Sequence, residues 1–189
     1  MIPFISTVTN VLSDGNCGFR AEAVSMERKA EEWIEVCKEM LAKMYLKGSV
    51  YGDQGVMGNI WGKSIASLKE RLNHTQGPCG IKLWMHFPTH GYLLADTYRS
   101  PVVLFSRQGS TTYLPLCHPP TENPPLCVIF LEELRHLISF KFKRDLSCFP
   151  YPQIDCLWQY HSKKEAKPWK NKVQKNLNVF QGAFNCQGK

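Results

Sequence analysis

The sequence predicts a single domain of the α+β or mixed α/β class, followed by a short basic tail. Hydrophobic residues make up 43% of the 189 residues, enough for a packed core. Segments with helical spacing come mostly first, and short apolar segments typical of strands come mostly last. One short helical segment leads directly into an apolar strand, which favours a mixed sandwich over a doubly wound sheet.

The first half of the chain is expected to be mainly helical. Its segments are an extended lead-in (1–11), a helix (18–26), a long amphipathic helix (27–47), a glycine-rich loop (48–62) and a shorter helix (63–73). The long helix has the clearest pattern, because its apolar side chains recur every three or four residues, at Trp33, Val36, Cys37, Met40 and Met44. Gly48 is expected to end this helix.

The second half is expected to contain most of the sheet. It holds a short helix (91–98) and four strands, at 102–106, 111–116, 126–131 and 136–142. The third of these strands, LCVIFL, is apolar throughout, as is typical of a strand buried on both faces. The proline-rich segment 118–125 is expected to be a loop.

The positive charge of the chain is concentrated at its end. The formal net charge is +7, and residues 163–189 hold seven lysines and one glutamate. Residues 1–162, which are nearly neutral, are expected to form the folded domain, and 163–189 to form a solvated tail that is separable from catalysis. Lysines interleaved with aromatic residues suit nucleic-acid binding, so nucleic acid is a minor alternative partner for this tail.

The stretch LSDGNCGFRAEA (12–23) places a cysteine between a turn and a helix. Asp14, Gly15 and Asn16 form a turn sequence, and Cys17 lies where the helix is expected to begin. At a helix N-terminus the dipole favours the thiolate, and unpaired backbone N–H groups can stabilise an oxyanion. This arrangement suits a cysteine nucleophile, with the backbone of 14–17 as the oxyanion loop. The alternative is a half-buried structural cysteine.

SDGNCGFRA resembles the nucleophile motif of the ovarian-tumour (OTU) family of cysteine deubiquitinases. Trp84, with GYLLA at 91–95 and PVVL at 101–104, resembles the helix-into-strand segment of that family. RHLIS at 135–139 lies where the family carries its catalytic histidine. The order of these motifs holds over residues 10–143, and the segments that follow resemble OTU-like domains of fungi and of mobile-element-derived proteins. The resemblance implies an OTU-like cysteine protease fold, with helices flanking a small central sheet.

The resemblance also implies a reaction and a partner. Cys17 would attack the carbonyl of an isopeptide bond to ubiquitin or a ubiquitin-like modifier, and His136 would act as general base, without a metal or organic cofactor. Glu132 and Glu133, just before the histidine, form a solvated turn or contact arginines in the ubiquitin tail. We expect the protein to be a monomer. We also expect it in the cytoplasm or nucleus, because the first residues lack a signal-peptide pattern and no apolar run is long enough for a membrane span.

The third catalytic group is left open by the sequence. Family members commonly carry Asp or Asn two residues after the histidine, on the same face of the strand, where this chain has Ile138. Asn10 and Asp14 are the preferred groups to orient the histidine ring, because both lie near the nucleophile in sequence. Asp145 and Asp155 are more distant alternatives. With no such group, the chain would be a slow enzyme or a catalytically silent OTU-fold module that binds ubiquitin or, through its tail, nucleic acid.

The other histidines and the cysteines give weaker signals. His86 and His90 are four residues apart, but Pro88 between them argues against a helical metal site, so no metal site is expected. His118 is the second candidate for the base. The eight cysteines include no CxxC pair and are expected to be mostly small buried hydrophobic residues.

Overall fold

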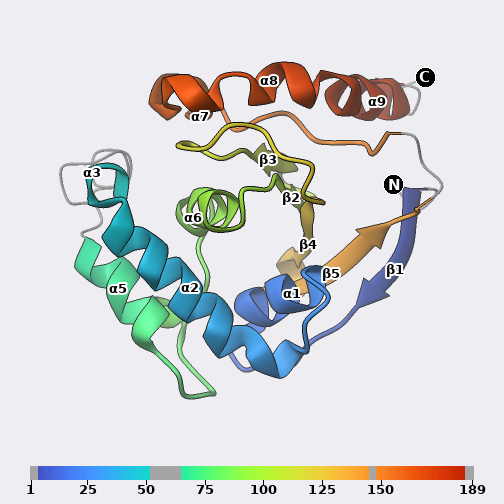
Figure 1. Cartoon of the computed structure of the whole chain (residues 1–189). Helices are drawn as coiled ribbons and strands as arrows, with labels where there is room; N and C mark the ends of the chain where they lie inside the picture. Colours follow the sequence, from blue (N-terminus) through green and yellow to red (C-terminus); the bar gives the residue numbers. More distant parts are fainter. Residues whose placement is uncertain (1–3, 52–64, 145–147, 186–189) are drawn as a thin grey trace.

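A five-stranded sheet lies at the centre of the molecule (Figure 1). The structure is a computed structural model that describes residues 4–51, 65–144 and 148–185. The strands are β1 (Ile5–Thr9), β2 (Val102–Phe105), β3 (Thr111–Tyr113), β4 (Leu126–Leu131) and β5 (His136–Phe142). Their order across the sheet is β1-β5-β4-β2-β3, and β2 and β4 run parallel while the other neighbours are antiparallel.

Helices flank the sheet as the sequence predicts. They are α1 (Cys17–Ser25), α2 (Trp33–Leu46), α3 (Gly48–Tyr51), α5 (Ile65–Asn73) and α6 (Thr89–Tyr98). The helices α1 and α6 contact strands of the sheet, and α2 packs on both of these helices. The mixed α+β class, with helices flanking a small sheet, is confirmed. In Figure 1, α1, α2 and α5 lie on one side of the molecule, and α6 leads into β2 near its centre. Most of the expected glycine-rich loop, 48–62, lies outside the described residues.

The long amphipathic helix is shorter than its sequence pattern predicts. Its five apolar positions are all buried, which confirms the predicted face: Trp33, Val36, Cys37, Met40 and Met44. The helix begins at Trp33 rather than at residue 27, because Glu27 adopts a left-handed φ of 63° and a 3-10 turn covers Ala30–Glu32. Gly48 does not end the helical region; α2 ends at Leu46, and the short α3 begins at Gly48.

The lysine-rich segment after residue 162 is folded onto the domain. It follows α7 (Trp158–His161) and contains the 3-10 turn Lys164–Ala166, α8 (Trp169–Lys172) and α9 (Gln174–Asn185), which form a row along one side of the molecule (Figure 1). Its Ala166, Trp169 and Val173 belong to the hydrophobic core. The core therefore crosses the expected domain boundary, and the expectation of a solvated tail is wrong for residues 163–180.

Two indole N–H groups fix this C-terminal layer. Trp158 Nε1 donates to the carbonyl of Pro115 at 3.0 Å, and Trp169 Nε1 donates to the carbonyl of His118 at 2.9 Å. A buried indole needs such an acceptor, since an unpaired polar group in the core costs about 1–3 kcal/mol. The chain between the sheet and these helices also lines the edge of β3, where Thr112 N donates to Gln153 O at 2.9 Å.

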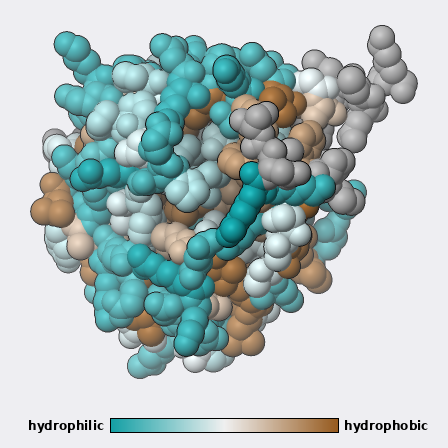
Figure 2. All heavy atoms as spheres, turned by 45° about the vertical axis from the view of Figure 1, so that its right-hand side comes forward, coloured by the Kyte–Doolittle hydropathy of each residue, from teal (hydrophilic) through white to brown (hydrophobic). Residues whose placement is uncertain are grey.

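The outer surface is mixed in character. Figure 2 shows a face that is largely hydrophilic, with hydrophobic side chains in separate patches. The exposed large hydrophobic residues are Val8, Leu12, Tyr45, Leu46, Ile81, Leu134 and Tyr160. Among the helices that the structure describes, none is sufficiently long and apolar to span a membrane.

One carboxyl group is enclosed in the core next to the nucleophile segment. Glu22 lies on α1 and is 0% exposed. Neither of its carboxyl oxygens has a hydrogen-bond partner in the described parts of the chain. Burial raises the pKa of Glu22 from 4.5 to about 8, because a charged carboxylate is costly in an apolar environment. Glu22 is therefore protonated at neutral pH.

This buried carboxyl predicts a stability that falls with rising pH. The folded chain holds one more proton than the unfolded chain between the unfolded pKa of 4.5 and the folded pKa of about 8, so stability is lost as the pH rises through this window. We expect the free energy of unfolding to fall by about 4 kcal/mol across it. Glu22→Gln should flatten this dependence, which urea unfolding at several pH values measures. Parallel pH profiles for the two proteins would contradict the assignment.

Candidate active site

Cys17 is the first residue of α1 and follows a tight turn. The turn depends on Gly15, whose φ is 87°, in the left-handed region. A Cβ at this position would lie 2.3 Å from the carbonyl oxygen of Cys79 and 2.9 Å from Nε1 of Trp84. Glycine is therefore required both by the backbone conformation and by the close approach of a second segment.

Asp14 shapes this turn and does not contact the histidine. Its carboxylate pairs with Arg20 at 2.7 Å and accepts the backbone N–H of Asn16 at 3.0 Å. Although burial alone would raise the pKa of Asp14, its bonds to Arg20 and Asn16 hold that pKa below the usual value. The sequence analysis expects Asp14 to be a catalytic group. In the structure, its carboxylate oxygens accept the hydrogen bonds that hold the oxyanion loop.

A segment around residues 76–85 covers the oxyanion loop. Cys79 N donates to Asp14 O at 2.7 Å, and Asn16 Nδ2 donates to Gln76 O at 3.4 Å. Trp84 Nε1 donates to Cys79 O at 3.2 Å, which closes the segment on itself. Asn16 is only 1% exposed as a result. The sequence analysis missed this covering role, since the segment has no periodic pattern that would place it.

His136 begins β5 and is held by Asn10. Asn10 directly follows β1, the neighbour of β5, and its Oδ1 lies 2.8 Å from His136 Nε2. Asn10 Oδ1 also accepts the N–H of Val11 at 2.9 Å, which fixes the amide with its oxygen toward the ring. The accepting oxygen places the Nε2 proton on the histidine, so Nδ1 carries the lone pair.

The remaining ring nitrogen of His136 is suited to take a proton. His136 Nδ1 is buried and has no hydrogen-bond partner within the described residues. The next residue along β5, Leu137, presents its backbone N–H to the Cys17 thiol. The start of β5 therefore lies against the start of α1.

The thiol is enclosed in this resting structure. Cys17 is 8% exposed, and burial raises its pKa above the usual value, against the opposing effect of the backbone N–H groups of Leu137 and Gly18. Met85 packs against the next residue, because a Cβ on Gly18 would lie 2.6 Å from the Met85 Cβ. Cys17 is therefore a thiol at neutral pH until a base removes its proton.

The other candidate residues lie elsewhere or outside the described chain. Asp155 accepts the Tyr92 hydroxyl and the N–H of Leu157, and Asp145 lies outside the described residues. His118, the second candidate base, has Lys43 Nζ 3.1 Å from its Nε2. Within the described residues, Asp155 and His118 make no hydrogen bond to His136. The side chain that does so is Asn10.

The two glutamates before His136 are engaged in local contacts. Glu132 accepts the Ser106 hydroxyl at 2.7 Å and the Arg107 N–H at 2.6 Å, and these and other local bonds lower its pKa to about 2. Glu133 pairs with Arg107 at 2.5 Å. Both side chains therefore order the 106–108 turn, which leaves little support for a role in binding the ubiquitin tail.

His86 and His90 contact each other locally. The His86 N–H donates to His90 Nδ1 at 3.0 Å. Across residues 4–51, 65–144 and 148–185, no group of three or more His, Cys, Asp or Glu side chains is arranged to hold a metal ion.

A groove lies close to Gly18, the residue that follows Cys17. It has a volume of about 460 Å³ and is bordered by Met85 and Leu137, the two residues that flank Cys17 and Gly18. Its other walls are mainly apolar and aromatic, with polar groups at one side, and they include Ile81, Trp84, Phe87, Leu104, Phe130, Ser106, Gln108 and Arg135. Such a groove can take an extended chain close to the start of α1.

Comparison with known proteins identifies the fold. No protein-family profile matches the sequence, and no curated protein matches it significantly. Among solved structures, the OTU protease of Dera Ghazi Khan virus is similar, with a TM-score of 0.56 and 11% identity over 76% of this chain and 84% of that one. The OTU domain of OTUD1 gives 0.54 and 10% over 71% and 84%. The Hazara virus OTU, solved bound to ubiquitin, gives 0.53 and 10% over 75% and 84%.

These likenesses define the class of the fold. At 10–12% sequence identity, these structures show that the architecture is shared and do not show that the chemistry is shared. The chain has an OTU-like fold, which confirms the resemblance seen in the sequence. Within that fold, Cys17, His136 and Asn10 come together from the start of α1, the start of β5 and the end of β1.

Proposed function

We propose that this chain is a cysteine isopeptidase that cleaves ubiquitin or a ubiquitin-like modifier from proteins. The observation that carries the proposal is the hydrogen bond between Asn10 Oδ1 and His136 Nε2 at 2.8 Å, next to Leu137, whose backbone N–H faces the Cys17 thiol. The OTU-like fold supports it, since the similar structures are OTU proteases and one of them is bound to ubiquitin.

The proposed reaction needs only groups that the chain supplies. His136 Nδ1 takes the proton of Cys17, and the thiolate attacks the isopeptide carbonyl. Backbone N–H groups of the 14–17 turn and of the first turn of α1 stabilise the oxyanion. The protonated histidine then gives its proton to the leaving lysine amine, and water hydrolyses the thioester to release the carboxylate and regenerate the thiol.

The alternative is a catalytically silent module that binds ubiquitin. The observation that favours this alternative is the enclosure of the thiol, which is 8% exposed and has a raised pKa. The two proposals therefore differ in whether the enclosed thiol becomes accessible when ubiquitin binds.

A ubiquitin probe with a C-terminal electrophile separates the two functions. We expect covalent labelling of the intact protein, no labelling of Cys17→Ala, and normal labelling of Cys156→Ala, which removes an exposed cysteine elsewhere. Intact-protein mass spectrometry measures the adduct. Probe binding without an adduct would favour the silent module. Equal labelling of Cys17→Ala and the intact protein would exclude Cys17 as the nucleophile.

A further inference from the structure

Trp84 connects the groove to the segment that covers the oxyanion loop. It lines the groove of about 460 Å³ together with Met85 and Leu137. Its Nε1 donates to the carbonyl oxygen of Cys79 at 3.2 Å, within the covering segment. One half-buried side chain therefore borders the space that an extended chain can enter and also fixes the backbone beside the nucleophile turn.

The backbone of Cys79 contacts this turn through both of its polar groups. Cys79 N donates to Asp14 O at 2.7 Å. Cys79 O lies so close to Gly15 that a Cβ on that residue would lie 2.3 Å from it. The indole Nε1 of Trp84 would lie 2.9 Å from the same Cβ. The carbonyl that Trp84 binds is therefore the one that packs against Gly15.

The bond from Cys79 N sets the direction of the peptide unit between Asp14 and Gly15. The C=O and N–H of a planar trans peptide point in opposite directions, so a bound Asp14 carbonyl directs the Gly15 N–H away from Cys79. Gly15 has a φ of 87°, and glycine tolerates both hands of the backbone, so sterics at this residue do not prevent the unit from flipping. The hydrogen bond from Cys79 supplies that restraint.

The Gly15 N–H is a donor that the resting turn leaves available. Within the described residues, no hydrogen bond uses it, whereas the Asn16 N–H donates to Asp14 Oδ1 at 3.0 Å. The other contacts of the covering segment hold the Asn16 side chain, through Gln76 O at 3.4 Å and Cys79 Sγ at 3.5 Å. They do not bind the peptide unit between Asp14 and Gly15, whose orientation depends on Cys79 N.

We propose that Trp84 is a positioning residue for the oxyanion loop. Its indole N–H fixes Cys79, Cys79 N fixes the Asp14 carbonyl, and the Gly15 N–H is thereby kept in place to stabilise the oxyanion. The inference rests on the proposed function, because it assigns Trp84 a part in the proposed hydrolysis. Trp84 does not touch the reacting atoms in this scheme, so its loss should slow the chemical step without removing the base or the nucleophile.

The variant Trp84→Phe tests this role on the full chain. Phenylalanine keeps an aromatic wall in the groove and removes the N–H donor. In hydrolysis of a fluorogenic ubiquitin substrate, we expect kcat to fall by about tenfold or more and KM to stay within about threefold. A purely structural role in the groove would instead change KM, because the ring would pack differently on the substrate.

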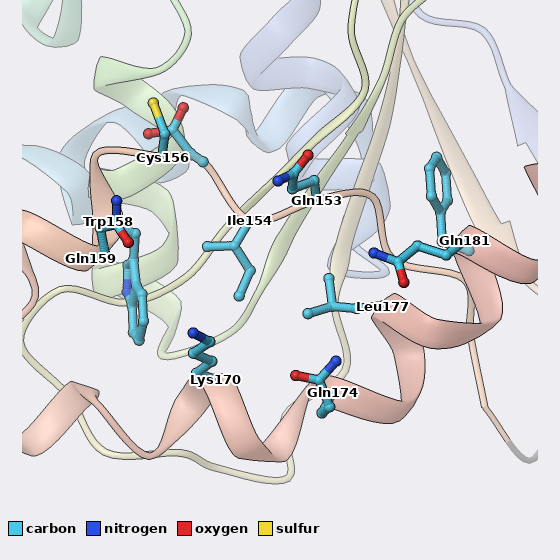
Figure 3. Close-up of a pocket in the computed structure, with 11 residues that line it drawn as sticks. Gln153, Ile154, Cys156, Trp158, Gln159, Lys170, Gln174, Leu177 and Gln181 are labelled. Atoms are coloured by element: carbon cyan, nitrogen blue, oxygen red, sulfur yellow. The ribbon is translucent and has the colours of Figure 1, made fainter.

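Trp158→Phe is the matched control. Trp158 Nε1 also donates to a backbone carbonyl, that of Pro115, at 3.0 Å. Figure 3 shows Trp158 at a different pocket, of about 430 Å³, between residues 153–159 and the helices α8 and α9. The control loses the same kind of hydrogen bond, so it should lose stability while its kcat stays within about twofold. Equal losses of kcat in both variants, or an unchanged kcat in Trp84→Phe, would overturn the proposal.

Amide hydrogen exchange, measured by NMR, tests the same link without any substrate. The Cys79 N–H is protected by its bond to Asp14 O, so it should exchange about tenfold faster in Trp84→Phe, while the amides of β2 exchange as slowly as in Trp158→Phe. An unchanged exchange rate at Cys79 would overturn the proposal. If the intact protein does not hydrolyse the ubiquitin substrate, the proposed function fails, and faster exchange in Trp84→Phe still supports the hold of Trp84 on the loop.

Discussion

Replacing His136 with alanine should abolish most of the proposed isopeptidase activity, and replacing Asn10 should reduce it strongly. Loss of a general base typically costs 10²- to 10⁴-fold in rate, so we expect a fall of about 10³-fold in kcat for His136→Ala. Asn10 touches the ring and not the substrate, so its loss leaves the base in place but free to rotate. For Asn10→Ala we expect a fall of about 10- to 100-fold in kcat, with KM little changed.

The conservative variant Asn10→Asp distinguishes positioning from folding. A carboxylate beside Nε2 favours the imidazolium, so it should move the lower limb of the pH–rate profile to higher pH. Hydrolysis of a fluorogenic ubiquitin substrate across the pH range measures this shift. An unchanged profile, or full activity in Asn10→Ala, would remove Asn10 from the site.

Replacing Trp169 with alanine should destabilise the whole domain. Trp169 is 1% exposed, and its indole binds the carbonyl of His118 at 2.9 Å. Truncation of a buried tryptophan costs about 3–5 kcal/mol, a large part of the stability of a typical domain. We expect a fall of this size in the free energy of unfolding, measured by urea denaturation followed by circular dichroism.

A matched aromatic residue in the same layer supplies the control. Tyr160 is 73% exposed, so Tyr160→Ala should change the free energy of unfolding by less than about 0.5 kcal/mol. Removal of residues 164–189 should have at least the effect of Trp169→Ala, because it also removes Val173 from the core. If the truncated chain had an unchanged free energy of unfolding, the segment would be a separable tail, as the sequence analysis expects.

The sequence predicts the elements that carry the nucleophile and the base because both have local signals. Cys17 follows a turn and begins a helix, and His136 begins an apolar strand. The contact between Asn10 and His136 joins residues 126 positions apart, so it depends on the pairing of β1 with β5. No local pattern encodes that pairing, which is why the sequence leaves the orienting group open among several candidates.

The sequence of the C-terminal layer contains a helical pattern of apolar residues, which its many lysines obscure. Trp169, Val173 and Leu177 recur at a spacing of four residues, which is typical of the buried face of a helix. The lysines between them indicate a solvated segment when they are counted as net charge. In the structure they occupy the exposed sides of α8 and α9, while Trp169 and Val173 enter the core.

The order of strands in the sheet sets when the site can assemble during synthesis of the chain. β1 pairs with β5, so the partner of the first strand leaves the ribosome after all the other strands. Until then Cys17 can sit on a formed α1 without its base, and the ring of His136 cannot meet Asn10. Long-range pairing of this kind is slow relative to helix formation. The nascent chain therefore carries Cys17 without the Asn10–His136 pair, which forms only after β5 has emerged.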